Sequence, residues 1–258
     1  MKLSGVLAGM SALVLCMSCS IKEDRGACPC RVIMDFSGVD TSAVSFLNIL
    51  AETPDGFVYK DVISQDEFGK EMEIEVPRTD VCINVYSGVD ESYLSGDGML
   101  IPYGAESPPV YVHAVLLDTR REWLREHVEM KKSHCVMTVR VRNDSGFPYD
   151  ISIRGNVNGL DRMGDPRDGD FQYMLPGTAE EGFIAIIPRQ KDSSLRLYVS
   201  ESGGADRAFA LGEYLQASGY DWSKDELEDV TVWLDYSMTH LSLVIRMWDG
   251  SYKYDIVI

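Results

Sequence analysis

Residues 46–63 read FLNILAETPDGFVYKDVI, and this stretch decides the fold class. Two runs rich in apolar and aromatic residues, 46–51 and 57–63, flank the tetrapeptide Thr53-Pro54-Asp55-Gly56. Proline fixes its own φ and glycine accepts positive φ, so this tetrapeptide is typical of the turn of a β-hairpin. The stretch therefore predicts two antiparallel strands joined by a turn.

Alternating apolar and polar residues continue from this hairpin along the chain. Successive side chains of a strand point to opposite faces, so a period of two predicts strands that bury one face. A short helix is predicted over 208–217, where Leu211, Tyr214 and Leu215 share one face and Gly219 can end it. Residues 119–130 fit either a capped helix or a strand. Further strands are predicted at 32–36, 72–76, 81–85, 110–117, 136–142, 149–153, 183–187, 195–200, 230–235, 241–248 and 252–258.

The spacing of these strands favours an all-β fold. Short strands between turn signals are typical of β-sandwiches, and no predicted helix is long enough to carry the chain between parallel neighbours. Residues 155–169 are rich in Gly, Asn and Asp and are predicted to form a long loop. The length of 258 residues suits two such domains. We expect an N-terminal sandwich over 28–131 and a C-terminal sandwich over 132–258.

The N-terminus has the layout of a secretory signal over residues 1–18. Lys2 supplies a positive charge, and the apolar run that follows is shorter than the about 20 residues that a membrane span needs. The small Ser18 precedes Cys19, as in a bacterial lipobox, although Cys16 stands where Leu or Val is usual. Cleavage before Cys19 and acylation of its thiol would anchor the chain to a membrane. Plain secretion with cleavage nearby is the alternative.

Residues 19–27 are polar and predict a tether between the lipid and the first strand. The formal charge of the full chain is -17. A surface of this sign repels nucleic acid, which is bound through cationic contacts to phosphate, and it is also repelled by anionic lipid headgroups. We therefore expect no nucleic-acid partner, and membrane contact only through the lipid on Cys19.

Four cysteines remain after the lipobox, and they allow three disulfide pairings. They are Cys28, Cys30, Cys82 and Cys135. The exported setting permits disulfides. The Cys28-Pro29-Cys30 segment fits neither half of a zinc ribbon nor the CxxC redox motif. Free buried thiols and one structural disulfide both remain open.

No catalytic or cofactor-binding pattern is present in the sequence. It contains no GxSxG turn, phosphate loop or dinucleotide fingerprint. The acidic run Asp161, Asp165, Asp168 and Asp170 lacks the spacing of a calcium loop. The histidines are too far apart in sequence to share one element as metal ligands. We expect no enzymatic activity, no cofactor and no metal. The four histidines are His113, His127, His134 and His240.

Two features near the C-terminus are candidates for contact with a partner. The acidic stretch 221–229 surrounds Trp222, and we interpret it either as a surface turn or as a contact made through the indole ring. The last predicted strand runs to Ile258. We expect it to pair within its own sheet, because an exposed edge invites aggregation, although donation to a neighbouring protein is the alternative.

Several segments, taken in order, resemble the FimB-type fimbrial anchor family of Bacteroides-type bacteria. The lipobox is followed by a short acidic tether and Cys28-Pro29. Residues 155–160 read GNVNGL and resemble the family's loop within its second domain. The segments LGEYL (211–215), GYDW (219–222) and LEDV (227–230) follow the family's order. The resemblance covers nearly the whole mature chain.

The resemblance implies two transthyretin-like β-sandwich domains and a non-enzymatic role. An anchor of this family would be a lipoprotein of the outer membrane at the base of a fimbrium, acylated at Cys19 with chains such as palmitate. It would hold the polymer and limit its length. Its partners would be fimbrial subunits, engaged by β-strand exchange. Two alternatives are a surface lipoprotein that stacks glycans on Trp222, Trp248 or Tyr252, and a fimbrial stalk or tip subunit processed at Arg25.

Overall fold

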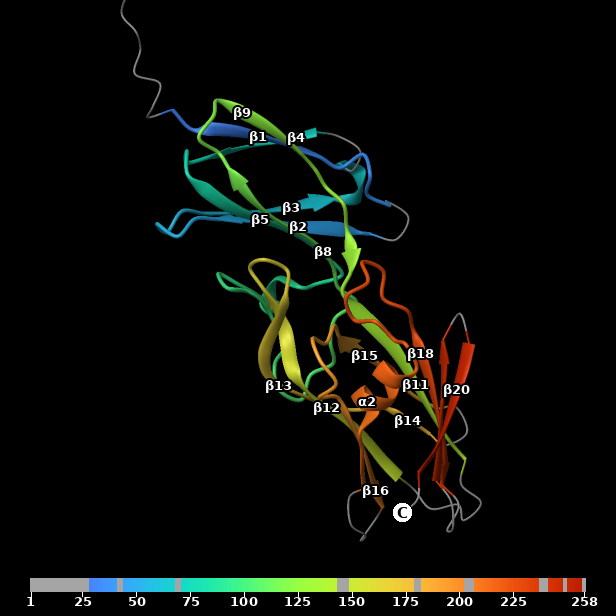
Figure 1. Ribbon diagram of the computed structural model, residues 1–258. Coiled ribbons are helices and arrows are strands. Elements are labelled where there is room, and N and C mark those ends of the chain that lie inside the picture. Colours follow the sequence, from blue (N-terminus) through green and yellow to red (C-terminus); the bar gives the residue numbers. More distant parts are fainter. Residues whose placement is uncertain are drawn as a thin grey trace, which may run out of the picture.

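The computed structural model describes residues 28–40, 44–67, 71–142, 149–178, 182–201, 207–236, 241–247 and 250–256. Strands dominate these ranges, and α2 (Leu211–Ala217) is their one α-helix. The predicted all-β fold with one short helix is therefore confirmed (Figure 1). The helix begins three residues later than predicted, because 207–209 form a strand. Within these ranges no helix is long and apolar enough to span a membrane. Cys19, the predicted signal and the tether lie outside the described residues.

The first half of the chain forms two sheets that enclose one core. A three-stranded sheet has the order β4-β1-β9, and a five-stranded sheet has the order β10-β8-β5-β2-β3. Val32, Ile74 and Ile83 are among the buried residues between them. The strands are β1 (Cys30–Asp35), β2 (Phe46–Glu52), β3 (Val58–Ser64), β4 (Glu71–Val76), β5 (Asp80–Ser87), β8 (Tyr111–Asp118), β9 (Trp123–His127) and β10 (Lys131–Lys132).

The second half, together with β6 and β7 from the first half, forms two further sheets around a second core. Their orders are β14-β15-β11-β18-β19-β20 and β17-β16-β12-β7-β6, with β13 paired to β12. Val139, Ile153 and Leu197 are among the buried residues. The strands are β6 (Leu94–Ser95), β7 (Gly98–Leu100), β11 (His134–Arg142), β12 (Tyr149–Asp161), β13 (Pro166–Met174), β14 (Gly177–Thr178), β15 (Gly182–Pro188), β16 (Arg196–Glu201), β17 (Arg207–Phe209), β18 (Val230–Tyr236), β19 (Leu241–Met247) and β20 (Gly250–Ile256).

The hairpin predicted from residues 46–63 is confirmed. β2 and β3 pair from Phe46↔Ser64 to Glu52↔Val58. At the turn, the Thr53 N–H donates to the Phe57 carbonyl at 3.1 Å. Gly56 adopts a φ of 92°, which is the conformation for which glycine is suited.

The two halves share one strand topology. β1 lies between the antiparallel β4 and the parallel β9, and β11 lies between the antiparallel β15 and the parallel β18. The β2–β3 hairpin corresponds to β12–β13, and the pair β2·β5 corresponds to β12·β16. The parallel pairs need no crossover helix, because the chain returns through strands of the opposite sheet. The argument against parallel neighbours from the lack of a long helix was therefore wrong.

The prediction of a long loop over residues 155–169 is also wrong. β12 continues to Asp161, and β13 begins at Pro166. Two shifts in register, between Gly155 and Val157 and between Val157 and Leu160, mark β-bulges. Residues typical of turns occur here because the paired strands bend. The ambiguous segment 119–130 contains the strand β9.

One segment of the first half packs in the second. β7 pairs with β12, with Leu100 opposite Gly159. Met99, Ile101 and Val110 are buried in the second core. The chain therefore crosses twice between the cores before β11 begins. The expected boundary between residues 131 and 132 stays a prediction.

Candidate functional site

The four cysteines of the described chain are free thiols. Cys28 is exposed, whereas Cys30, Cys82 and Cys135 are buried. Burial is the main cause that raises the pKa of each buried thiol, to about 12 for Cys135. A thiol with a raised pKa stays protonated at neutral pH and is a poor nucleophile. Of the two interpretations left open, the structure presents free thiols.

Trp222 lies in the turn ahead of β18 and is only partly exposed. Its ring meets that of Tyr220 edge to face, with the centroids 4.7 Å apart, and it packs against the second core. This packing leaves less of the indole ring for a partner than the sequence suggested. Contact with a partner through Trp222 stays a prediction. Of the other two aromatic residues named for glycan stacking, Tyr252 belongs to β20 and Trp248 lies outside the described residues.

Arg189 fastens the turn around Trp222 to the junction between the halves. It is 8% exposed, and its guanidinium donates to the carbonyl oxygens of Lys132 at 2.8 Å and of Trp222 at 2.5 Å. Burial is the main cause that lowers its pKa. Ion pairs of 2.7 Å join Lys131 to Asp225 and Lys132 to Asp229. These contacts hold the linking residues 131–133 against the segment before β18.

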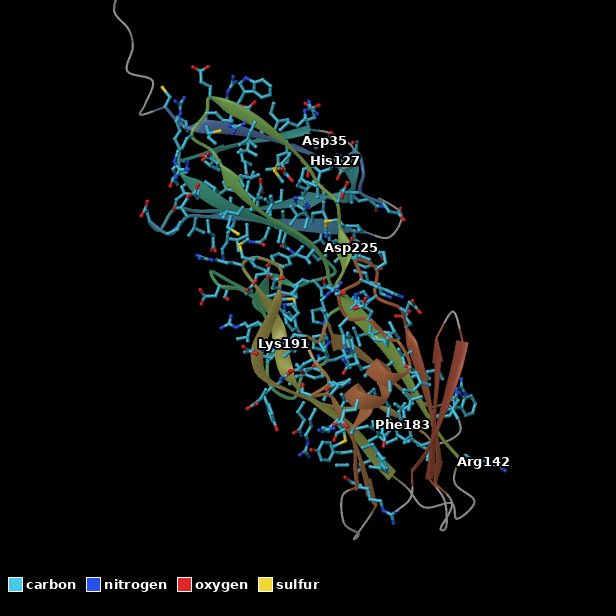
Figure 2. All side chains as sticks on the ribbon, viewed as in Figure 1. Asp35, His127, Arg142, Phe183, Lys191 and Asp225 are labelled. Carbon is cyan, nitrogen blue, oxygen red and sulfur yellow. The ribbon has the colours of Figure 1, made fainter. Side chains whose placement is uncertain are left out.

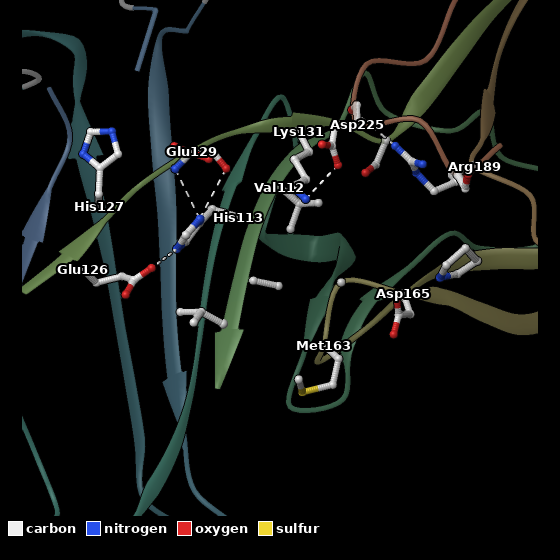
Figure 3. A pocket seen from close by; sticks show the side chains of 16 residues that line it. Val112, His113, Glu126, His127, Glu129, Lys131, Met163, Asp165, Arg189 and Asp225 are labelled. Atoms are coloured by element: carbon white, nitrogen blue, oxygen red, sulfur yellow. Dashed lines mark hydrogen bonds and ion pairs between the residues drawn. The ribbon is translucent and has the colours of Figure 1, made fainter. Parts of the chain in front are cut away.

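A cleft of about 580 Å³ lies beside this junction (Figure 3). β8 and β9 form one wall, and the β12–β13 turn forms the other. His113 Nε2 lies 3.2 Å from the carboxylate of Glu126, and its Nδ1 accepts from the Glu129 N–H at 3.3 Å. Burial is the main cause that lowers the pKa of His113. No Trp, Tyr or Phe is among the described residues that line the cleft, and this disfavours the stacking of a sugar ring.

The acidic run that was weighed as a calcium loop serves the β12–β13 turn. The carboxylate of Asp161 accepts from the backbone N–H groups of Met163 at 2.8 Å and Asp165 at 3.0 Å. Asp168 forms an ion pair with Lys191, which is labelled in Figure 2. Among the described residues, no group of three His, Cys, Asp or Glu side chains could hold a metal ion.

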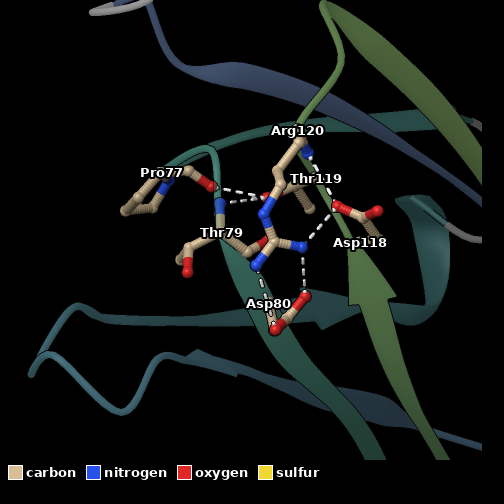
Figure 4. Close-up of polar contacts among 6 residues, drawn as sticks. All are labelled: Pro77, Thr79, Asp80, Asp118, Thr119 and Arg120. Atoms are coloured by element: carbon tan, nitrogen blue, oxygen red, sulfur yellow. Dashed lines mark hydrogen bonds and ion pairs between the residues drawn. The ribbon is translucent and has the colours of Figure 1, made fainter.

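A polar cluster fixes the corner where the chain passes from β8 to β9 (Figure 4). The hydroxyl of Thr119 lies 2.5 Å from the Pro77 carbonyl oxygen and 2.7 Å from that of Thr79. Arg120 donates to both carboxylate oxygens of Asp80, at 2.7 and 3.1 Å. The hydrogen bond from Arg120 is the main cause that lowers the pKa of Asp80. The corner therefore joins two places where the chain passes between the two sheets of the first half, from β4 to β5 and from β8 to β9.

The strands at the ends of the sheets are the other candidate sites, because a partner strand can add to an edge. The sheets of the first half end at β3, β4, β9 and β10, and those of the second core end at β6, β14, β17 and β20. Over residues 250–256, β20 pairs with β19, so the expected pairing of the last strand within its own sheet is confirmed there. These edges could not be located from sequence, because strand order depends on distant pairings.

No protein-family model and no curated protein matches the sequence. Solved structures do match its fold. The fimbrial anchor protein Mfa2 from Porphyromonas gingivalis has 15% identity, with 88% of this chain and 100% of that chain covered and a TM-score of 0.58.

Two proteins of Bacteroides match over a similar length. A protein of Bacteroides thetaiotaomicron described as a candidate polysaccharide-binding protein has 15% identity, covers 88% of this chain and 98% of that chain, and gives a TM-score of 0.59. A candidate adhesin of Bacteroides ovatus has 11% identity, covers 91% and 97%, and also gives 0.59. At such identities the likeness shows a shared fold, and it does not single out the FimB type.

Proposed function

We propose that this chain is an outer-membrane lipoprotein that anchors a fimbrium to the cell surface and limits its length. The observation that carries the proposal is the likeness in fold, over nearly the whole of both chains, to a fimbrial anchor protein. The lipobox at Cys19 supplies the means of attachment. Several acyl chains give durable anchoring, whereas a single chain binds reversibly.

The role is non-enzymatic and depends on protein–protein contacts. The partners are fimbrial subunits, and strand exchange at an open sheet edge is the means of contact. Buried, protonated thiols and the ion pairs at the junction are in keeping with a structural role. The division of the mature chain into sandwiches over 28–131 and 132–258 is part of this proposal.

Deletion of the gene tests the role. We expect fimbriae that are longer and are shed into the medium, as seen by electron microscopy, and we expect the protein to co-purify with fimbrial subunits from outer membranes. Unchanged attachment and length would reject the proposal. N-terminal sequencing of the mature protein separates an anchor, which begins at Cys19, from a stalk or tip subunit that has lost everything up to Arg25.

Metabolic labelling with a fatty-acid probe tests the lipid. We expect Cys19→Ala to abolish labelling and release the protein from the membrane fraction. Cys28→Ala is the matched control, because Cys28 is an exposed thiol beyond the tether and should leave labelling unchanged. Labelling that survives Cys19→Ala would show that the lipid is attached at another residue. It would contradict the proposed anchoring through Cys19.

Glycan binding is the second candidate function. It is favoured by the fold shared with a candidate polysaccharide-binding protein. A glycan array with the purified chain is the test. Binding that is lost in Trp222→Ala would support it, and an array without signal would count against it.

A further inference from the structure

β3 presents a long, regular and open strand edge. It ends the five-stranded sheet, and in the described part of the chain it pairs with β2 alone. That pairing runs in register over all seven residues of β3 without a bulge. Of the features that commonly protect such edges, β3 has two charged side chains, Lys60 and Asp61, but no proline or bulge, and it is not very short. On this edge the Val62 N–H donates to the Asp61 carboxylate at 2.8 Å and the Ser64 N–H donates to the Glu67 carboxylate at 3.0 Å. A further strand would replace these carboxylates as the partners of the two N–H groups.

A pocket of mixed apolar and polar lining lies on the outer side of this edge. It has a volume of about 270 Å³, and Leu50, Val62 and Leu94 contribute apolar surface. Its polar lining is made of Asn48, Lys60, Asp61 and Glu91. Val58 and Val62 point outward from β3 and are 54% and 53% exposed. Burial of two such side chains would stabilise a complex, because their apolar surface is removed from water. Every second side chain of a strand added to β3 would lie beside Val58 and Val62 and cover them.

An acidic groove lies on the inner side, where β3 faces β4 across the open side of the sandwich. Its volume is about 360 Å³. Phe36, Ile63 and Met72 contribute apolar surface. The described lining also contains four carboxylates and no Lys or Arg. These carboxylates are Asp61, Glu67, Glu71 and Glu73.

Among the described residues, only part of this negative charge is paired with a cation. Glu71 forms an ion pair of 2.6 Å with Arg125, and Glu73 forms one of 3.6 Å with Arg31. The other two carboxylates accept hydrogen bonds from neutral groups: Asp61 from the Tyr59 hydroxyl and the Val62 N–H, and Glu67 from the Ser64 N–H. The groove therefore keeps a negative charge that a basic segment can neutralise.

We propose that the β3 edge binds an extended, basic segment of a partner protein as an added strand. Lys or Arg would occupy alternate positions, with the alkyl stems over Ile63 and Met72 and the charges at the carboxylates of the groove. The intervening positions would be apolar and contact Val62 and Leu94. The inference deepens the proposed function, because a fimbrial subunit that carries such a segment would be held at this edge.

Peptide binding to the full mature chain tests the inference. The probe is a fluorescent nine-residue peptide that alternates Lys with Val, and binding is followed by fluorescence anisotropy. We expect saturable binding that weakens as salt is added, because surface charges are screened. The same peptide with Glu in place of Lys should bind at least about tenfold more weakly. A central proline, which removes a backbone N–H, should also weaken binding.

Matched variants locate the site. Val62→Lys should weaken binding about tenfold, because it places a like charge beside the added strand. Leu116→Lys is its control, since Leu116 is 55% exposed but lies on β8. The double variant Asp61→Asn with Glu67→Gln should weaken binding. Glu75→Gln should not, because Glu75 lies on β4 but lines neither the pocket nor the acidic groove. Circular dichroism checks folding, and Val62→Thr replaces Val62→Lys if the latter does not fold.

Three results would overturn the inference: no binding of the Lys peptide, equal binding of the Glu peptide, or an equal loss with Leu116→Lys. Failure here is distinct from failure of the proposed function. A chain that ignores the peptide but still co-purifies with fimbrial subunits would reject this edge alone. A chain that binds the peptide but leaves fimbriae unaffected when deleted would reject the anchor role alone.

Discussion

At the scale of single residues, Thr119 shows how one buried hydroxyl can hold a corner. It is 0% exposed and joins the residues before β5 to the end of β8. Thr119→Val keeps the shape but leaves the Thr79 N–H without its side-chain acceptor at 3.1 Å. We expect the free energy of unfolding to fall by about 1–3 kcal/mol in urea titrations.

The same substitution at Thr138 is the control for the corner. Thr138 is half-buried on β11, where valine suits a strand, so Thr138→Val should change stability by less than about 1 kcal/mol. An equal loss for both variants would show that the hydroxyl of Thr119 has no special role.

One buried and one half-buried histidine, His134 and His113, make stability depend on pH. Burial is the main cause that lowers the pKa of His134 and of His113 in the folded chain. Histidine in the unfolded chain titrates at about pH 6.5, so below that pH the unfolded state binds more protons than the folded state. The stabilising contribution is complete above about pH 6.5 and is lost as the pH falls below it.

We therefore expect the free energy of unfolding to fall between about pH 7 and pH 5. Lys132, which opposes protonation of His134, and Asp229, which favours it, lie close by and modify the effect. His134→Gln should flatten this part of the pH profile. A profile of the same slope in His134→Gln would contradict the assignment.

At the scale of elements, the local sequence pattern predicted the strands but did not show where they bend. The β2–β3 hairpin followed from Pro54 and Gly56, because the turn geometry depends on adjacent residues only. The β12–β13 hairpin was mistaken for a loop, because its glycines serve bulges and close contacts with a strand far away in sequence. No local pattern distinguishes these two uses of glycine.

Gly159 is where that close contact is most severe. Its φ is 152°, and an added Cβ would lie 2.0 Å from the Met99 carbonyl oxygen. Gly159→Ala should displace β7 and lower the free energy of unfolding by more than about 2 kcal/mol. Gly56→Ala is the control, since Gly56 also has positive φ but open space around it, and it should cost about 1 kcal/mol. If thermal or urea unfolding gave the same loss of unfolding free energy for both variants, backbone strain alone would explain the loss, and the contact with Met99 would have no part in it.

At the scale of the whole molecule, sequence predicted the fold class but not how the two cores share the chain. Parallel pairing of β1 with β9 joins residues about ninety positions apart, and the placement of β7 beside β12 depends on sheets that form elsewhere. The predicted site residue Cys19 rests on a local motif, so sequence could indicate it. The β3 edge could be identified only from the strand order, which places β3 at the end of its sheet.

β6 and β7 belong to the first half of the chain but pack with the second core, and this placement predicts how fragments behave. Residues 132–258 alone lack the apolar side chains of Met99 and Ile101 in their core, and each such loss costs about 2–5 kcal/mol. We expect this fragment to melt well below the intact chain in circular dichroism. A synthetic peptide of residues 88–112 should raise its melting temperature in proportion to the logarithm of peptide concentration, because it binds the folded state. A peptide of residues 44–67, which spans β2 and β3, is the control and should not. A fragment that melts at the same temperature with and without the first peptide would show that residues 132–258 form a self-sufficient domain.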